Sequence, residues 1–93
     1  MKSKIVERTD EYMDDLAAIE AHIAKDNPLA AVDMWLHIDD QVAQLSDPNY
    51  PRRPGRIAGT MELVAHENHI VVLKETASLV IVMNVIGARQ QWP

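Results

Sequence analysis

Residues 60–93 read TMELVAHENHIVVLKETASLVIVMNVIGARQQWP, and this stretch decides the fold. It contains three segments with the composition of β-strands, over residues 60–65, 70–73 and 79–86. Two polar segments, 66–68 and 75–78, separate these strands and are typical of tight turns. Because short turns join neighbouring strands that run in opposite directions, the stretch predicts an antiparallel three-stranded meander.

Two helices are predicted before this sheet. Thr9 is a candidate N-cap, and the apolar residues that follow it recur at spacings of three and four: Tyr12, Leu16, Ile19 and Ile23. They predict a helix over 10–25. Asn27 and Pro28 are typical of a second helix start, and a second apolar series predicts a helix over 28–46: Val32, Trp35, Ile38, Val42 and Leu45. The short connection between the two predicts an antiparallel helical hairpin.

A short segment at 4–8 predicts an opening strand, so the element order is β-α-α-β-β-β. Residues 46–55 contain three prolines and one glycine, which predicts a loop without regular structure. The simplest architecture is an α+β fold in which the antiparallel meander sheet packs against the N-terminal helical hairpin, with the opening strand on an edge. A chain of 93 residues without repeats predicts one domain over 1–93.

The composition narrows the class of protein. The chain has no cysteine, which excludes a disulfide framework, thiolate metal sites and cysteine nucleophiles. No apolar run is long enough for a transmembrane helix, so we expect a soluble cytoplasmic protein with no membrane partner. Residues 1–47 hold four basic and eleven acidic residues, whereas 48–93 hold five and three. The resulting net charge of -5 argues against direct DNA binding by this chain alone.

Three arginines, Arg52, Arg53 and Arg56, lie within a span of five residues at the end of the proline-rich loop. One interpretation is a cationic patch for an anionic partner, and the other is a solvated loop. The sequence leaves both open.

The histidines do not predict a metal site. His66 and His69 flank a predicted turn and could meet across it, but a metal ion would need a third ligand. Glu67 or Glu62 could serve, although the spacing does not require either. The chain also lacks the common phosphate-binding and hydrolase motifs. We therefore predict no metal and no other cofactor.

A dispersed polar group is the stronger candidate for a functional surface. It comprises Arg56, Glu62, His69, Arg89 and Trp92. Glu62 and His69 lie on neighbouring predicted strands, and the polar tail at 87–93 leaves the last one. Arginine suits phosphate groups, and tryptophan can stack on a base or anchor an interface. The group could bind RNA or a protein surface. Alternatively, its members could be ordinary polar residues of the sheet and of a loose C-terminus.

The order and spacing of several segments resemble the RelE/ParE superfamily of bacterial toxins from type II toxin–antitoxin modules. The segments are DLAAI at 15–19, DNPLAA at 26–31, PGRIAGTMELV at 54–64, IVV at 70–72 and NVIGARQQWP at 84–93. The ending RQQWP is similar to the plasmid-stabilisation branch, close to ParE. The resemblance covers nearly the whole chain and implies the α+β fold predicted above.

The resemblance also implies a growth-inhibiting toxin of the bacterial cytoplasm that a cognate antitoxin neutralises by wrapping around it. ParE-like members inhibit DNA gyrase, whereas RelE-like members cut mRNA in the ribosomal A site. Similarity to the ParE branch predicts a non-enzymatic gyrase inhibitor. Its predicted target-binding residues are Arg89, Gln90 and Trp92.

The alternative is a ribosome-dependent mRNA endoribonuclease. Its candidate catalytic residues are Arg56, Glu62, His69 and Arg89, with a glutamate–histidine pair acting as acid and base. The sequence departs from the nuclease pattern, however. His69 stands where the nucleases commonly have Arg, and Leu73 stands where Tyr is frequent. A third interpretation is a non-toxic relative that only binds an antitoxin.

Overall fold

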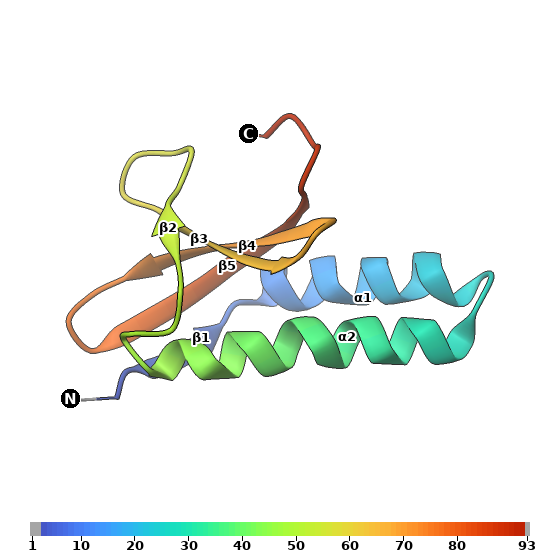
Figure 1. Ribbon diagram of the computed structural model, residues 1–93, viewed down its shortest axis with the longest axis horizontal. Coiled ribbons are helices and arrows are strands. Elements are labelled where there is room, and N and C mark those ends of the chain that lie inside the picture. Colours follow the sequence, from blue (N-terminus) through green and yellow to red (C-terminus); the bar gives the residue numbers. More distant parts are fainter. Residues whose placement is uncertain (1–2, 93) are drawn as a thin grey trace.

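The computed structural model describes residues 3–92, and in this part of the chain two helices cover one face of a five-stranded sheet (Figure 1). The strands are β1 (Ile5–Arg8), β2 (Arg53–Pro54), β3 (Met61–His66), β4 (His69–Glu75) and β5 (Leu79–Gly87). The helices are α1 (Asp10–Ala24) and α2 (Pro28–Ala43), and a short 3-10 helix, η1 (Gln44–Ser46), follows α2. The predicted α+β class is confirmed. Pro93, the last residue of the predicted tail, lies outside the described residues.

The side chain before each helix determines where that helix begins. Thr9 Oγ1 accepts a 3.2 Å hydrogen bond from the Tyr12 backbone N–H, and Asn27 Oδ1 accepts a 3.1 Å bond from Ala30. Pro28 occupies the first turn of α2, where its missing N–H leaves no bond unmade. Both predicted helix starts are therefore confirmed. The predicted helix over 28–46 is α2 continued by the tighter winding of η1.

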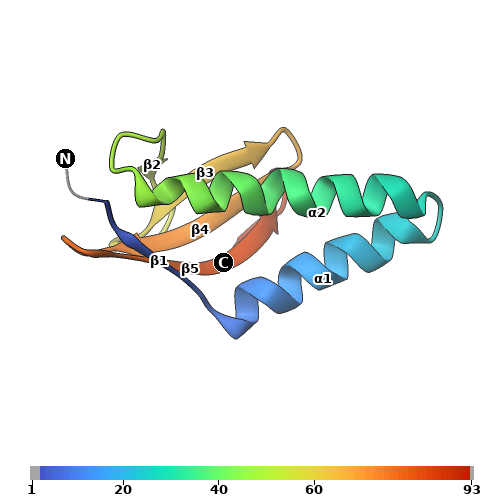
Figure 2. The ribbon, with the colours of Figure 1, turned by 90° about the horizontal axis from the view of Figure 1, so that it is seen from below.

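The sheet has the strand order β1-β5-β4-β3-β2, which places β4 at its centre. Strands β3, β4 and β5 form the predicted antiparallel meander. Strand β1 lies on an edge as predicted and runs parallel to β5, with Ile5 opposite Leu79. Figure 2, seen from below, shows α1 and α2 in front of this sheet and joined by a short turn. Neither helix within residues 3–92 has the length and apolar character needed to cross a membrane.

Strand β2 corrects one prediction. Residues 46–55 were predicted to have no regular structure, yet Arg53 pairs with Glu62 and Pro54 pairs with Met61 on β3. The prediction was wrong at these two positions because a proline is tolerated at the edge of a sheet, where it need not donate to a neighbouring strand. The pairing continues into the loop through a 2.8 Å bond from Gly55 N to Thr60 O.

The two faces of the sheet bury different residues. Toward the helices lies the main core of Tyr12, Leu16, Ile38, Val42, Leu45, Leu63, Ala65, Val71, Leu73, Val80, Val82 and Val85. On the opposite face, which we call the open face, Ile70, Val72 and Ile86 form a second buried cluster. This division follows from strand geometry, since successive side chains point to opposite faces. The open face is where the C-terminal segment leaves the sheet (Figure 1).

Candidate target-binding site

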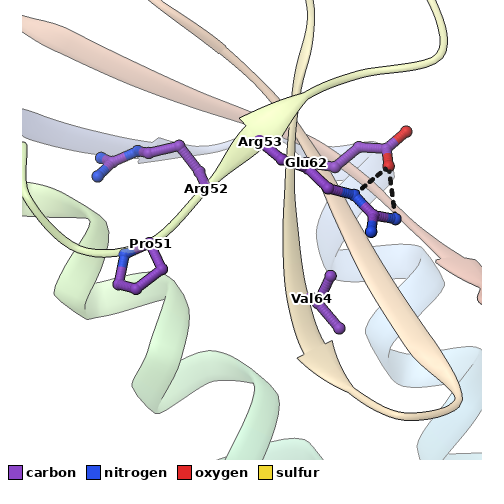
Figure 3. A pocket seen from close by; sticks show the side chains of 5 residues that line it. All are labelled: Pro51, Arg52, Arg53, Glu62 and Val64. Atoms are coloured by element: carbon purple, nitrogen blue, oxygen red, sulfur yellow. Dashed lines mark hydrogen bonds and ion pairs between the residues drawn. The ribbon is translucent and has the colours of Figure 1, made fainter.

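Glu62 is a buried carboxylate on the open face. It lies on β3 opposite Val72 of the open-face cluster. Its side chain is only 3% exposed, and Arg53 donates to Glu62 Oε1 from Nε and Nη2, both at 3.2 Å. Figure 3 shows Arg53 reaching Glu62 while Arg52 points away. A buried carboxylate is costly without a partner, so the arginine explains why Glu62 can occupy this position.

Arg56 gives Glu62 a second cationic partner. The Arg56 backbone N–H donates to Glu62 Oε2 at 3.1 Å, and the Arg56 Nε lies 3.6 Å from the same oxygen. Arg56 Nη1 also donates a 3.0 Å hydrogen bond to the backbone carbonyl of Gln90. Arg56 therefore connects residues 53–60, which we call the arginine loop, to the C-terminal segment.

Residues 87–92, which we call the tail, fold into a turn against the open face. The Gln90 N–H donates to Gly87 O at 3.0 Å, and the Gly87 N–H donates to Gln90 Oε1 at 3.0 Å. Trp92 packs against the open-face cluster, whereas Arg89 is exposed. The tail consequently presents a cation to solvent and is anchored by an indole ring.

A shallow cavity of about 230 Å³ lies beside Glu62. Its lining residues are Pro51, Arg52, Arg53, Glu62 and Val64 (Figure 3). Val64 is 50% exposed and the Arg53 side chain 54%. The cavity thus combines an apolar wall with an accessible cation, which suits an apolar or acidic side chain of a protein partner.

His69 lies on the other side of the sheet. With residues Ala18, Ile19, His22 and Ile23 of α1 it lines a cavity of about 280 Å³. Burial, together with the nearby His66, lowers the pKa of His69 below its ordinary value. Because Glu62 points to the open face and His69 to the helix face, the structure does not bring the two together.

The predicted contact of His66 and His69 across the turn is present, with ring centroids 5.7 Å apart. His66 also meets His37 of α2 edge to face, again with centroids 5.7 Å apart. Within residues 3–92, no group of three or more histidine, cysteine or carboxylate side chains is arranged to hold a metal ion.

The structure joins part of the predicted group and separates the rest. Arg56, Glu62 and the tail form one connected unit on the open face, and His69 lies outside it. Sequence reasoning missed Arg53 as a partner of Glu62, because that part of the loop was not expected to pair with β3. One signal was available: Glu62 lies in a strand that is otherwise apolar, and three arginines precede it.

Comparison with known proteins gives a consistent assignment. Residues 6–92 match the family described as the ParE toxin of the type II toxin–antitoxin system parDE. The chain is 36% identical over 78 residues to Y4kP of Sinorhizobium fredii (strain NBRC 101917 / NGR234), which is named as a candidate toxin. That match covers 84% of this chain and 81% of Y4kP.

Solved structures share the fold. A chain from the chromosomal ParDE toxin–antitoxin system of P. aeruginosa superposes with a TM-score of 0.81 at 19% identity, covering 91% of this chain and 96% of that chain. YafQ from E. coli strain BL21(DE3) superposes with a TM-score of 0.56 at 15% identity, covering 91% and 93%. At such low identities the likeness concerns the fold alone.

Proposed function

Because this chain belongs to the ParE toxin family of type II toxin–antitoxin systems, we propose that it stops growth by binding DNA gyrase. It is the toxin component of such a module, within the ParE/RelE superfamily, and its partner is a cognate antitoxin. Gyrase is the target implied by the similarity of the C-terminal residues to the ParE branch. In this proposal the toxin acts by occupying a protein surface, and the antitoxin prevents that contact.

The observation that carries the proposal is the tail on the open face. Trp92 packs against the sheet and Arg56 binds the Gln90 carbonyl, so an exposed Arg89 is presented from a fixed segment. A contact residue on an ordered segment binds with less loss of conformational entropy than one on a mobile end. We assign contact with gyrase to Arg89, anchoring to Trp92, and the shape of the tail to Gln90.

The geometry of Glu62 favours this proposal over RNA cleavage. An acid–base pair must reach the same reacting group. Glu62 and His69 instead lie on opposite faces of the sheet, and Arg53 and Arg56 already occupy the Glu62 carboxylate. A net charge of -5 also weakens electrostatic attraction to ribosomal RNA.

Supercoiling of relaxed plasmid by purified gyrase tests the proposal. The wild-type protein should inhibit supercoiling, and Arg89→Ala should raise the concentration for half inhibition by about tenfold, the size of a modest interface hot spot. Lys25→Ala is the matched control, because it removes an exposed cation at the far end of α1. Unchanged supercoiling at a large excess of wild-type protein would overturn the proposal.

A translating extract separates this mechanism from the alternatives. Intact mRNA in the presence of the wild-type protein is expected. Cleavage that His69→Ala or Arg89→Ala abolishes would favour the endoribonuclease instead. Normal growth of cells that express the chain without its antitoxin would favour a non-toxic antitoxin-binding module.

A further inference from the structure

We propose that Arg56 is a positioning residue that holds the tail in its target-binding shape, with the buried Glu62 as its anchor. This inference rests on the proposed function, because it assigns to the tail the contact with gyrase. It gives Arg56 and Glu62, which the sequence suggested as nuclease residues, a different role: they connect the arginine loop to the tail across the open face.

The anchor is well defined because Glu62 cannot exchange its partners for water. Its side chain is 3% exposed, and both carboxylate oxygens are occupied, Oε1 by Arg53 and Oε2 by Arg56. Removing partners from a buried carboxylate costs far more than breaking a surface ion pair. Glu62 therefore holds the backbone of Arg56 at one place above the sheet.

Hydrogen bonds within the arginine loop close it tightly and so keep the Arg56 backbone in this position. Gly55 N donates to Thr60 O at 2.8 Å, and Thr60 Oγ1 donates to Ile57 O at 2.7 Å. A Cβ atom at Gly55 would overlap the Thr60 hydroxyl and lie 3.0 Å from the Thr60 carbonyl carbon. The loop therefore closes as it does because Gly55 lacks a side chain.

The guanidinium group of Arg56 suits a link between two partners. Its Nε faces Glu62 Oε2 at 3.6 Å while Nη1 donates to Gln90 O at 3.0 Å, across 34 positions of sequence. Arginine carries five donors in a planar fork, so one side chain can serve both acceptors in fixed directions. A lysine has a single nitrogen and would have to divide it between them.

The acceptor lies at the centre of the tail. The same residue, Gln90, closes the turn with Gly87 through its own N–H and its side-chain oxygen. The Arg56 bond to Gln90 O therefore restrains the whole turn. This turn includes Arg89, the residue directly before Gln90. Trp92 holds the far end of the tail, so the two contacts together fix its direction.

Amide hydrogen exchange by NMR on the full 93-residue chain tests the link without any target. In Arg56→Ala, the Gly87 and Gln90 amides should exchange about three- to tenfold faster, the loss expected from one hydrogen bond. Amides of the central strand β4 should not change. Arg53→Ala is the matched control, because it removes a cationic partner of the same carboxylate and leaves the Arg56 side chain, which donates to Gln90 O, in place.

Each outcome of the exchange measurement decides the proposal. Faster tail exchange in Arg56→Ala but not in Arg53→Ala supports it. Unchanged exchange in both variants overturns it. Equal acceleration in both also overturns it, because the tail would then respond to the loss of a cationic partner of Glu62 rather than to the loss of the Arg56 bond to Gln90 O. Arg56→Lys should fall between wild type and Arg56→Ala, and it replaces Arg56→Ala if the latter does not fold.

The gyrase supercoiling assay then tests whether the position of the tail, held by Arg56, affects the inhibition of gyrase. Arg56→Ala should raise the concentration for half inhibition by about three- to tenfold, with partial recovery in Arg56→Lys. Full inhibition by Arg56→Ala, despite a loosened tail, would overturn the positioning role. If the wild-type protein does not inhibit gyrase, the proposed function fails, and the exchange data still decide whether Arg56 holds the tail.

Discussion

The hydroxyl of Tyr12 donates a 2.8 Å hydrogen bond to Asp39 Oδ1, which joins the start of α1 to the C-terminal part of α2. Arg8 of β1 donates to the same oxygen from Nε at 2.8 Å. Tyr12 is fully buried, and burial together with the Asp39 carboxylate raises the pKa of Tyr12 well above its ordinary value. One carboxylate thereby ties together β1, α1 and α2.

Tyr12→Phe should lower the free energy of unfolding by about 1–2 kcal/mol, because it removes a hydrogen bond to a charged group inside the core. Denaturant unfolding at neutral pH measures the change. Tyr50→Phe is the matched control, since Tyr50 donates only a 3.3 Å bond to the neutral Gln41 side chain. A loss for Tyr12→Phe no larger than for Tyr50→Phe would show that the Asp39 network contributes little.

Leu16→Ala should lower the free energy of unfolding by about 2–5 kcal/mol, because Leu16 is fully buried and its truncation leaves a cavity between α1 and the sheet. Leu29→Ala offers a control with the same chemistry on α2, where Leu29 is 79% exposed and should cost less than about 0.5 kcal/mol. Thermal unfolding of the two variants compares them directly. Similar midpoints would contradict the packing described for α1.

Gly55→Ala should destabilise the chain by about 1–3 kcal/mol, since its Cβ would overlap the Thr60 hydroxyl and open the arginine loop. For Gly87→Ala we expect a different result. Its Cβ would meet the Gln90 side chain at 3.5 Å, which is an ordinary contact, so stability should change little. Chemical denaturation checks both. A harmless Gly55→Ala would mean that the loop closes in another way.

Acidification should destabilise the chain through His69. The pKa of His69 is lowered by burial first and by His66 second, so the unfolded chain binds a proton more readily than the folded one. The contribution of His69 to stability is therefore present above about pH 6.5 and is lost as pH falls through the lowered pKa. His22, which lines the same cavity, is the second titratable group that faces it.

Denaturant unfolding at about pH 7.5 and pH 5.5 measures this effect. Wild-type protein should lose more stability between these values than His69→Gln does. Identical pH dependence in His69→Gln and wild type would show that His69 does not sense acid.

Much of the fold was predictable because its signals are local. Thr9 and Asn27 satisfy the first N–H groups of their helices from within the same turn, so their side-chain chemistry alone indicates both helix starts. The meander was predictable for a similar reason, since a short turn places consecutive strands next to each other. The candidate site was predictable only in part: Arg56, Glu62 and the tail were singled out, but their connections were not.

By itself, then, the sequence determined the helical hairpin, the antiparallel meander and the ordered segments that indicate the family. Only the tertiary structure decided that β1 runs parallel to β5, that Arg53 pairs beside Glu62, and that Glu62 and His69 face opposite ways. Alternation along a strand specifies two faces, but strand register and the packing of the helices determine which face becomes the core. The Arg56 bond to Gln90 spans 34 positions and exists only once both segments have reached the open face.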